Sequence, residues 1–469
     1  MKRRKKLWIM AALLGVVLIV TVSVALIGQK MEKIQASGAP ILEIPVDSVT
    51  GLSWDYNGET LAFTKDEEGW HYEGDEEFPV SAYALESMAA PFERFSAAFR
   101  IDEVEDYGQY GLEQPVVTIG ITAGDQDYTV RVGAFSQMDQ QRYVDIGDGS
   151  VYLVYHDPMM EFDVGIRQVI EHDSQPYFDG ADRITFSGKE NYVIEKEPEG
   201  AGSYREEDVY FVLQNGAYRP LSTPAVNSYL STISLLHLTD YKTYTADEET
   251  LADYGLDAPE LTVQVDYTPD ENQETFVLHI ARDPKALAEA EQAEDPDSVV
   301  VPVYARVGDS RIVYEIGKVD YDSLMACGYD DLRHQEVFPA SIDDVTAMTV
   351  TLEGRSYSIE SAMDEEDNRL FTFGGQEVDG SYILSALRSL NVEEFTAEAP
   401  TGKLEIRLEV TLNDAGTVTL ELFRLDGSSC LARVDGEVIG TLPRSQVVEL
   451  TEQINSIVLN PPEETEPAA

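Results

Sequence analysis

A short pattern occurs twice in this chain, and its repetition constrains the fold more than any other feature. The pattern is Tyr-Gly-Leu, an acidic residue, any residue and Pro, and it occupies residues 110–115 and 254–259. The same order of signals surrounds both copies, as expected for a chain built from tandem units. A third, degenerate copy has Glu398-Ala399-Pro400 at the corresponding place without Tyr-Gly-Leu.

Each unit is predicted to contain a hairpin with a short third strand, one helix and a meander of four strands. Asn57-Gly58 between alternating segments is a strong signal for a tight hairpin turn. The fold class predicted is α+β: three tandem repeats, each an antiparallel sheet with one packed amphipathic helix, behind a single N-terminal transmembrane helix. The predicted repeats are residues 40–170, 171–333 and 334–460, the last being the degenerate one.

The helix of each repeat is predicted from apolar residues at helical spacing. In the first repeat Ser81 is the expected N-cap and Pro91 the expected kink or restart. Thr223, followed by Pro224, and Asp379 are the expected N-caps of the second and third helices. These apolar stripes are interpreted as core. The first stripe comprises Leu85, Met88, Phe92, Phe95 and Phe99.

The repeated motif is interpreted as structural, on the loop that leads from the helix back to the sheet. Glycine permits a left-handed backbone conformation, and the leucine beside it can close the edge of the core. Proline fixes an extended entry into the first strand of the meander. The residues with this predicted role are Tyr110, Gly111, Leu112, Pro115, Tyr254, Gly255, Leu256 and Pro259.

The N-terminus predicts a membrane anchor. Residues 7–27 carry no charge and are long enough, as a helix, to span a hydrocarbon core of about 30 Å. The basic residues 1–6 are expected in the cytoplasm, with a stalk at 28–39 and the bulk of the chain outside the cell membrane. A cleavable signal peptide is the alternative; its apolar region is usually shorter, although Ser23-Val24-Ala25 is a weak cleavage site.

The charge balance is strongly acidic. Asp and Glu number 87 against 33 Lys and Arg, a net charge of −54. Binding of nucleic acid depends on Lys and Arg that neutralise phosphate, so a nucleic-acid partner is not expected. Cationic partners, or solubility alone, fit this composition. Residues 461–469 are predicted to form a disordered acidic tail.

The sequence indicates no particular chemistry. Cys327 and Cys430 give no disulfide framework, and buried free thiols are expected. No catalytic, cofactor-binding or metal-binding residue is predicted. The acidic run at 364–368 could bind Ca²⁺ weakly but lacks the spacing of a calcium loop, so a solvated hairpin tip is favoured. None of the six histidines forms a zinc-hydrolase motif: His71, His156, His172, His237, His279 and His334.

The chain resembles a known family in these features. A helix, then Tyr-Gly-Leu-[Glu/Asp]-x-Pro, then a meander ending in Val151-Tyr152 or Val313-Tyr314 is similar to domain-of-unknown-function family 4340. The resemblance covers most of residues 40–330, and the third repeat by pattern alone. It implies an envelope protein with a single transmembrane segment, commonly encoded near ABC transporters similar to those of the gliding-motility type. It supplies no catalytic residue.

The predicted function is therefore a membrane-anchored, extracytoplasmic, non-catalytic binding or scaffold protein, an accessory of an envelope ABC transporter or assembly complex. Its predicted partners are the membrane, through the N-terminal helix, and ABC-transporter subunits. Two alternatives stay open: an enzyme that acts on cell-wall glycan through unidentified carboxylates, and an acidic binder of cationic peptides. The sequence leaves open the identity of the partner and the oligomeric state.

Overall fold

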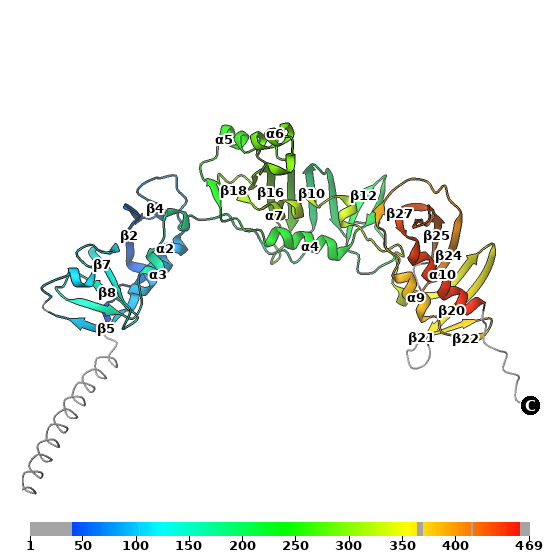
Figure 1. Cartoon of the computed structure of the whole chain (residues 1–469), viewed down its shortest axis with the longest axis horizontal. Coiled ribbons are helices and arrows are strands. Elements are labelled where there is room, and N and C mark those ends of the chain that lie inside the picture. Colours follow the sequence, from blue (N-terminus) through cyan, green and yellow to red (C-terminus); the bar gives the residue numbers. More distant parts are fainter. Residues whose placement is uncertain (1–39, 103, 364–368, 414–415, 460–469) are drawn as a thin grey trace, which may run out of the picture. The chain divides into compact units, whose positions relative to one another are not determined.

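The computed structural model describes residues 40–102, 104–363, 369–413 and 416–459 (Figure 1). The predicted anchor, stalk and acidic tail lie outside these ranges. Within them, no helix is long and apolar enough to cross a membrane. The chain divides into two compact units, and each is described by itself. The first holds the residues up to Asp173 together with Thr243–Ala246, and the second holds Ser174–Lys242 and Asp247–Ala469.

The described residues form mostly β-structure, in three antiparallel sheets of nine strands each. Their strands lie within residues 40–154, 183–316 and 345–443, and we call each sheet with its helices a repeat. In every sheet the hairpin strands lie beside the four meander strands, and the strand that follows the helix pairs with the last meander strand. Repeat 1 adds a strand beyond that last pairing, whereas repeats 2 and 3 add one at the opposite edge.

The strand bounds, in the order of each sheet, are as follows. Repeat 1 comprises β1 (Pro40–Leu42), β5 (Phe95–Ile101), β9 (Val151–Val154), β8 (Gln141–Asp145), β7 (Gln126–Ser136), β6 (Val117–Ala123), β2 (Val49–Tyr56), β3 (Glu59–Lys65) and β4 (Trp70–Tyr72). Repeat 2 comprises β13 (Ala217–Pro220), β12 (Tyr210–Gln214), β11 (Tyr192–Lys196), β10 (Arg183–Gly188), β15 (Leu261–Tyr267), β16 (Glu274–Arg282), β17 (Val303–Val307), β18 (Val313–Ile316) and β14 (Tyr241–Thr243). Repeat 3 comprises β22 (Gln376–Val378), β21 (Arg369–Phe373), β20 (Arg355–Met363), β19 (Val345–Leu352), β24 (Leu404–Leu412), β25 (Thr417–Arg424), β26 (Ser429–Val434), β27 (Glu437–Pro443) and β23 (Glu394–Phe395).

Short helices connect and cover these strands. Repeat 1 has α2 (Ala82–Ala89), α3 (Met159–Phe162) and the 3₁₀ helices η1 (Val46–Ser48), η2 (Ala90–Arg94), η3 (Gly108–Tyr110) and η4 (Ile166–Gln168). Repeat 2 has α4 (Thr223–Ser234), α5 (Glu248–Asp253), α6 (Pro284–Gln292), η5 (Pro296–Ser298), α7 (Lys318–Met325) and α8 (Tyr329–Leu332). Repeat 3 has η6 (Ile342–Asp344), α9 (Ser381–Arg388) and α10 (Arg444–Val458).

One face of each sheet forms the core because its strands alternate between apolar and polar residues. At matching register positions Trp54 lies opposite Ile119, Phe186 opposite Val263, and Val350 opposite Leu408, and all six are buried. Helices cover this face. The Trp54 ring contacts Phe162 of α3, and the Phe186 ring contacts Tyr229 of α4.

Several predicted details of the helices are wrong. The stripe in the first repeat ends as a helix at Ala89, continues as η2, and becomes strand β5 at Phe95, so Phe95 and Phe99 are strand residues. Pro91 lies at the start of η2, consistent with a restart. The N-cap of α4 is Ser222 rather than Thr223, and that of α9 is Gly380 rather than Asp379.

Other local predictions agree with the structure. The Ser81 hydroxyl accepts a hydrogen bond from Ala84 N–H and caps α2. Asn57 and Gly58 both have positive φ, as a tight hairpin turn of this type requires. The acidic, alanine-rich insertion at 282–298, for which a short exposed helix or a mobile loop is expected, contains α6, capped by Asp283.

Candidate functional site

The two copies of Tyr-Gly-Leu adopt the same backbone geometry. Gly111 and Gly255 have φ of 71° and 72°. The Gly111 N–H donates to Gly108 C=O, and the next N–H donates back five residues to Tyr107 C=O; the second copy repeats both bonds. This pair of bonds is a Schellman motif, in which a left-handed glycine ends a helical turn and satisfies its last carbonyl groups.

The side chains of the motif pack against the sheet face that carries Tyr143 in repeat 1 and Tyr304 in repeat 2. Leu112 and Leu256 are buried, at 1% and 4% exposure. The Tyr110 ring lies 5.0 Å from that of Tyr143, and the Tyr254 ring lies 4.6 Å from that of Tyr304. Each copy packs within its own repeat. Pro115 and Pro259 precede β6 and β15, with one residue between in each copy.

On this face, three residues that are neighbours across the first three meander strands form a row. The residue types in this row differ among the repeats. In repeat 1, Arg131 and Asp145 form an ion pair across β7 and β8. In repeat 3 the matching residues are Glu421 and Arg433, which form an ion pair at 2.6 Å. Here the acidic residue is on the earlier strand, whereas in repeat 1 the basic residue is. In repeat 2 they are His279 and Arg306, which cannot neutralise each other. The remaining members of the three rows are Thr118, Thr262 and Arg407.

The cross-strand neighbours of His279 in this row, Thr262 and Arg306, determine its environment. The Nδ1 atom of His279 lies 2.9 Å from the Thr262 hydroxyl, and Arg306 Nε donates to Ser310 C=O at 2.6 Å. Burial, and secondarily the positive charge of Arg306, lowers the pKa of His279. The side chain is therefore a neutral, packed histidine at physiological pH.

Repeats 2 and 3 meet at a polar joint within the second compact unit. Arg205 donates from Nε to Pro339 C=O and from Nη2 to Phe338 C=O, both at 3.2 Å. The Tyr204 hydroxyl donates to Asp435 at 2.7 Å. Around them, Arg219 forms an ion pair with Glu437, and the Arg333 guanidinium lies 4.4 Å from the centre of the Phe395 ring.

A buried carboxylate lies at the centre of this joint. The Asp208 side chain is 1% exposed; its Oδ1 lies 2.8 Å from His334 Nε2, and its Oδ2 accepts from Ser203 at 2.6 Å. His334 Nδ1 faces Arg205 Nη1 at 3.2 Å and Glu336 Oε2 at 3.6 Å. The buried charge is thus surrounded by hydrogen-bond partners, which is what keeps such a group stable inside a protein.

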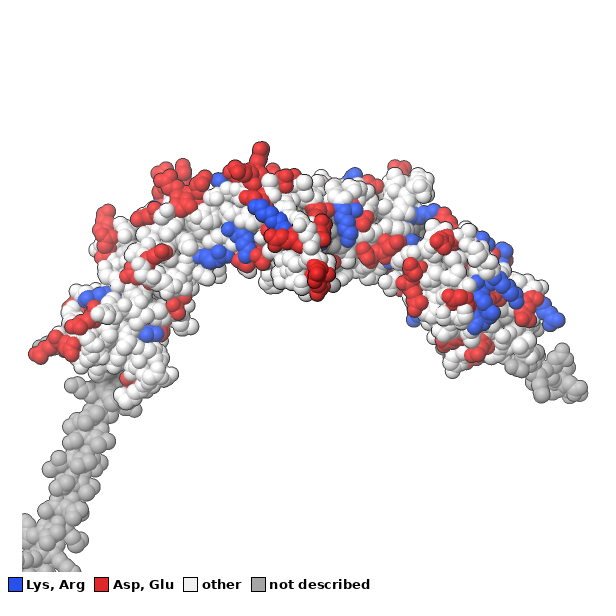
Figure 2. All heavy atoms as spheres, turned by 45° about the horizontal axis from the view of Figure 1, so that its top comes forward, with Lys and Arg blue, Asp and Glu red and all other residues white. Residues whose placement is uncertain are grey.

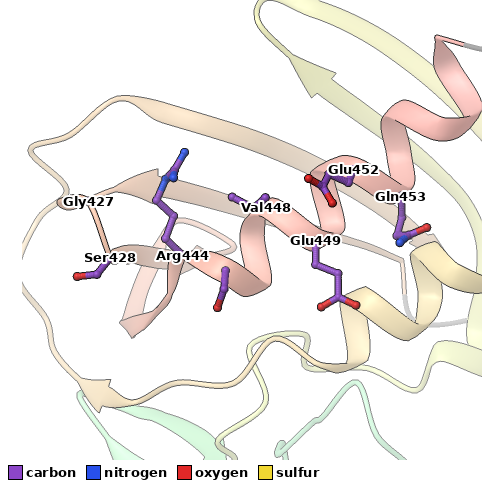
Figure 3. Close-up of a pocket in the computed structure, with 8 residues that line it drawn as sticks. Gly427, Ser428, Arg444, Val448, Glu449, Glu452 and Gln453 are labelled. Atoms are coloured by element: carbon purple, nitrogen blue, oxygen red, sulfur yellow. The ribbon is translucent and has the colours of Figure 1, made fainter.

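Two cavities are candidates for ligand binding. One, of about 150 Å³, lies beside the joint and is lined by Arg205, Glu207, Glu336, Phe338, Ala340, Ser341, Ile342 and Arg388. The other, of about 700 Å³, is a wide groove along α10, lined by Gly427, Ser428, Arg444, Ser445, Val448, Glu449, Glu452 and Gln453. Figure 3 shows that Arg444 lies at one end of this groove and that Glu452 and Gln453 lie at the other.

The remaining chemical groups are structural in character. Burial raises the pKa of the Cys327 thiol to about 11 and that of Cys430 to about 12, so both are protonated. In the described ranges, no group of three or more His, Cys, Asp and Glu residues is placed to hold a metal ion. The acidic run at 364–368 lies outside those ranges. Figure 2 shows Asp and Glu distributed widely over the visible surface.

Comparison with known proteins identifies part of the chain. Residues 212–409 match the model for a domain of unknown function (DUF4340). Over this stretch the chain is similar to the DUF4340 family. The match begins at β12 and ends in β24, so it covers parts of repeats 2 and 3, whereas the resemblance was expected mainly over residues 40–330. No curated protein and no solved structure matches the chain.

The DUF4340 stretch contains the second Tyr-Gly-Leu motif and the linker side of the joint, but not the first motif. The residues of the joint and of its cavity were missed by sequence analysis. Arg205 and Asp208 contact residues more than 120 positions away, and no local pattern marks such contacts. The one signal available was the position of His334 at a predicted repeat boundary.

Proposed function

We propose that this DUF4340-containing chain is a membrane-anchored, extracytoplasmic, non-catalytic binding or scaffold protein, an accessory of an envelope ABC transporter or assembly complex. The observation that carries the proposal is the joint, through which two successive repeats form one compact unit. Tandem repeats joined by fixed interfaces provide extended, preformed binding surfaces. The uncharged segment at 7–27 supplies the predicted anchor.

The arrangement of buried charge also supports a non-catalytic role. The buried carboxylates of the described residues are Asp145, Asp208 and Glu421, and each is held by a cation or by hydrogen bonds. Catalytic acids are instead positioned at a cleft that a substrate can enter. We interpret these three side chains as part of the folded framework.

The test is a quantitative pull-down of the full-length chain from cells that express it naturally, in mild detergent, with mass spectrometry of the recovered proteins. The matched control carries residues 1–39 of this chain fused to an unrelated soluble domain. We expect ABC-transporter subunits in stoichiometric amount with the full chain and not with the control. Recovery with both baits, or with neither, would contradict an accessory role of the repeats.

A further inference from the structure

The cavity of about 150 Å³ beside the joint is lined by charges of both signs from two repeats. Glu207 precedes β12 of repeat 2, and Arg388 is the last residue of α9 in repeat 3. The linker between the repeats supplies Glu336, together with an apolar wall that includes Phe338 and Ile342. A ligand in this cavity would therefore contact both repeats at once.

Two of these charges are not neutralised by the protein. Within the parts of the chain that the structure describes, neither the Glu207 carboxylate nor the Arg388 guanidinium has an ion-pair or hydrogen-bond partner. By contrast, Arg205 donates to two linker carbonyl groups and lies 3.8 Å from Glu336. Glu207 and Arg388 thus carry opposite charges and line the same small cavity, but they do not form an ion pair with each other in the described structure.

We propose that this cavity binds a small zwitterion, such as a free α-amino acid. The planar guanidinium of Arg388 suits a carboxylate, to which it can donate two parallel hydrogen bonds. Glu207, with Glu336 beside it, would accept hydrogen bonds from the ammonium group. The volume restricts the side chain of the ligand to a small one, which would lie against Phe338 and Ile342. Interactions between charges are stronger in a partly enclosed site than in bulk water.

Binding at this position would also strengthen the joint. The ligand would bridge Glu207 of repeat 2 and Arg388 of repeat 3, and it would be released when the repeats separate. A ligand that binds only the joined state stabilises that state in proportion to the logarithm of its concentration above Kd. This inference concerns a different ligand and a different surface from the proposed transporter partner, so either can fail without the other.

The experiment is a titration of the full-length protein in detergent with matched probes, followed by isothermal calorimetry and by thermal unfolding. Glycine and alanine carry both charges, acetate lacks the ammonium group, and glycinamide lacks the carboxylate. We expect saturable binding and a rise in the unfolding temperature with glycine and alanine, and neither effect with acetate or glycinamide. An equal response to acetate would indicate a simple anion site and overturn the proposal, as would no response to any probe.

Variants locate the site. Arg388→Gln and Glu207→Gln should each weaken binding of glycine at least tenfold. Both side chains are exposed and unpaired, so the unliganded unfolding temperature should be unchanged. Arg355→Gln, which removes another exposed arginine of repeat 3 that does not line the cavity, should bind glycine like the natural chain. Unchanged binding by the first two variants would overturn the assignment.

Discussion

At the scale of single residues, Gly111 shows how closely the Tyr-Gly-Leu loop approaches the sheet. Its φ of 71° is unfavourable for any residue with a Cβ atom, and a Cβ there would lie 2.8 Å from the backbone nitrogen of Ala134. Gly124, in a hairpin turn of the same repeat, has a φ of 59° but open space around it. A Cβ atom at Gly111 would therefore meet both backbone strain and a steric clash, whereas a Cβ atom at Gly124 would meet backbone strain alone.

Gly111→Ala should destabilise repeat 1 by about 2–3 kcal/mol, because strain and collision with a fixed strand add together. Gly124→Ala should cost only about 1 kcal/mol, the strain alone. Chemical denaturation of both variants measures the difference. Equal losses would show that the loop relaxes away from Ala134 and that the close approach has no energetic role.

The two cysteines allow a second prediction at this scale. Cys327 and Cys430 are fully buried, and burial raises the pKa of both thiols well above neutral pH. Since the thiolate is the reactive form, neither should be alkylated by iodoacetamide at pH 8 while the protein is folded. Mass spectrometry should detect full labelling of both after unfolding in guanidinium. Rapid labelling of the native protein at either position would contradict the buried location.

At the scale of elements, the meander of repeat 2 should be sensitive to acid through His279. The pKa of this histidine is lowered in the folded state from its ordinary 6.5, by burial and then by Arg306. Well above pH 6.5 the histidine is neutral in both states and does not change the free energy of unfolding. As pH falls below 6.5, the unfolded chain takes up the proton more readily, so folding loses stability.

His279→Gln should remove this loss. The unfolding temperature of the second compact unit should fall less between pH 7 and pH 5 in the variant than in the natural chain. His172→Gln is the control, because burial also lowers the pKa of His172 but that residue belongs to the first compact unit. The hypothesis fails if both variants change the pH response of the second compact unit equally.

Prediction from sequence succeeded where the periodic signal is strong. The meander strands alternate over five or more residues in most cases, and their apolar positions face the helices as expected. The failures are the strands that follow each helix. Phe92, Phe95 and Phe99 are spaced like one face of a helix, yet β5 begins at Phe95. Its pairing with β9, more than 50 residues later, decides the conformation, and local spacing contains no information about it.

At the scale of the whole molecule, we expect the joint to couple the unfolding of repeats 2 and 3, which belong to one compact unit. Arg205 holds three acceptors on the linker side: the carbonyl groups of Phe338 and Pro339, and His334 Nδ1. Its side chain is only 14% exposed. Such a forked contact needs the geometry of a guanidinium, and a lysine ammonium cannot reproduce it.

Arg205→Lys should weaken the second compact unit by about 2 kcal/mol, the value of a few hydrogen bonds to a charged donor. The unfolding of repeats 2 and 3 should then separate into two transitions in hydrogen-exchange measurements. Arg183→Lys is the control, because Arg183 forms an ion pair with Glu195 in which the arginine side chain is half exposed. This variant should change the free energy of unfolding by less than about 0.5 kcal/mol. A single transition in Arg205→Lys would show that the joint is held by other contacts.

The candidate sites could not be predicted from the sequence for a related reason. The Tyr-Gly-Leu loop was found because it is local and repeated. The joint and its cavity combine Glu207, Glu336 and Arg388, which are distant in the chain and ordinary in an acidic sequence. They come together only because repeats 2 and 3 pack against each other. That packing depends on contacts between distant residues, and the spacing of residues along the sequence does not indicate such contacts.

The outermost strands of the sheets have a consequence for association between copies of the protein. The six edge strands among the described residues are short: β1, β4, β14 and β22 have three residues, β13 has four and β23 has two. Long free edges invite pairing with other chains, and very short ones offer few unpaired backbone groups. Copies of this β-rich protein should therefore resist aggregation when they are concentrated, without the need for a chaperone to cover them.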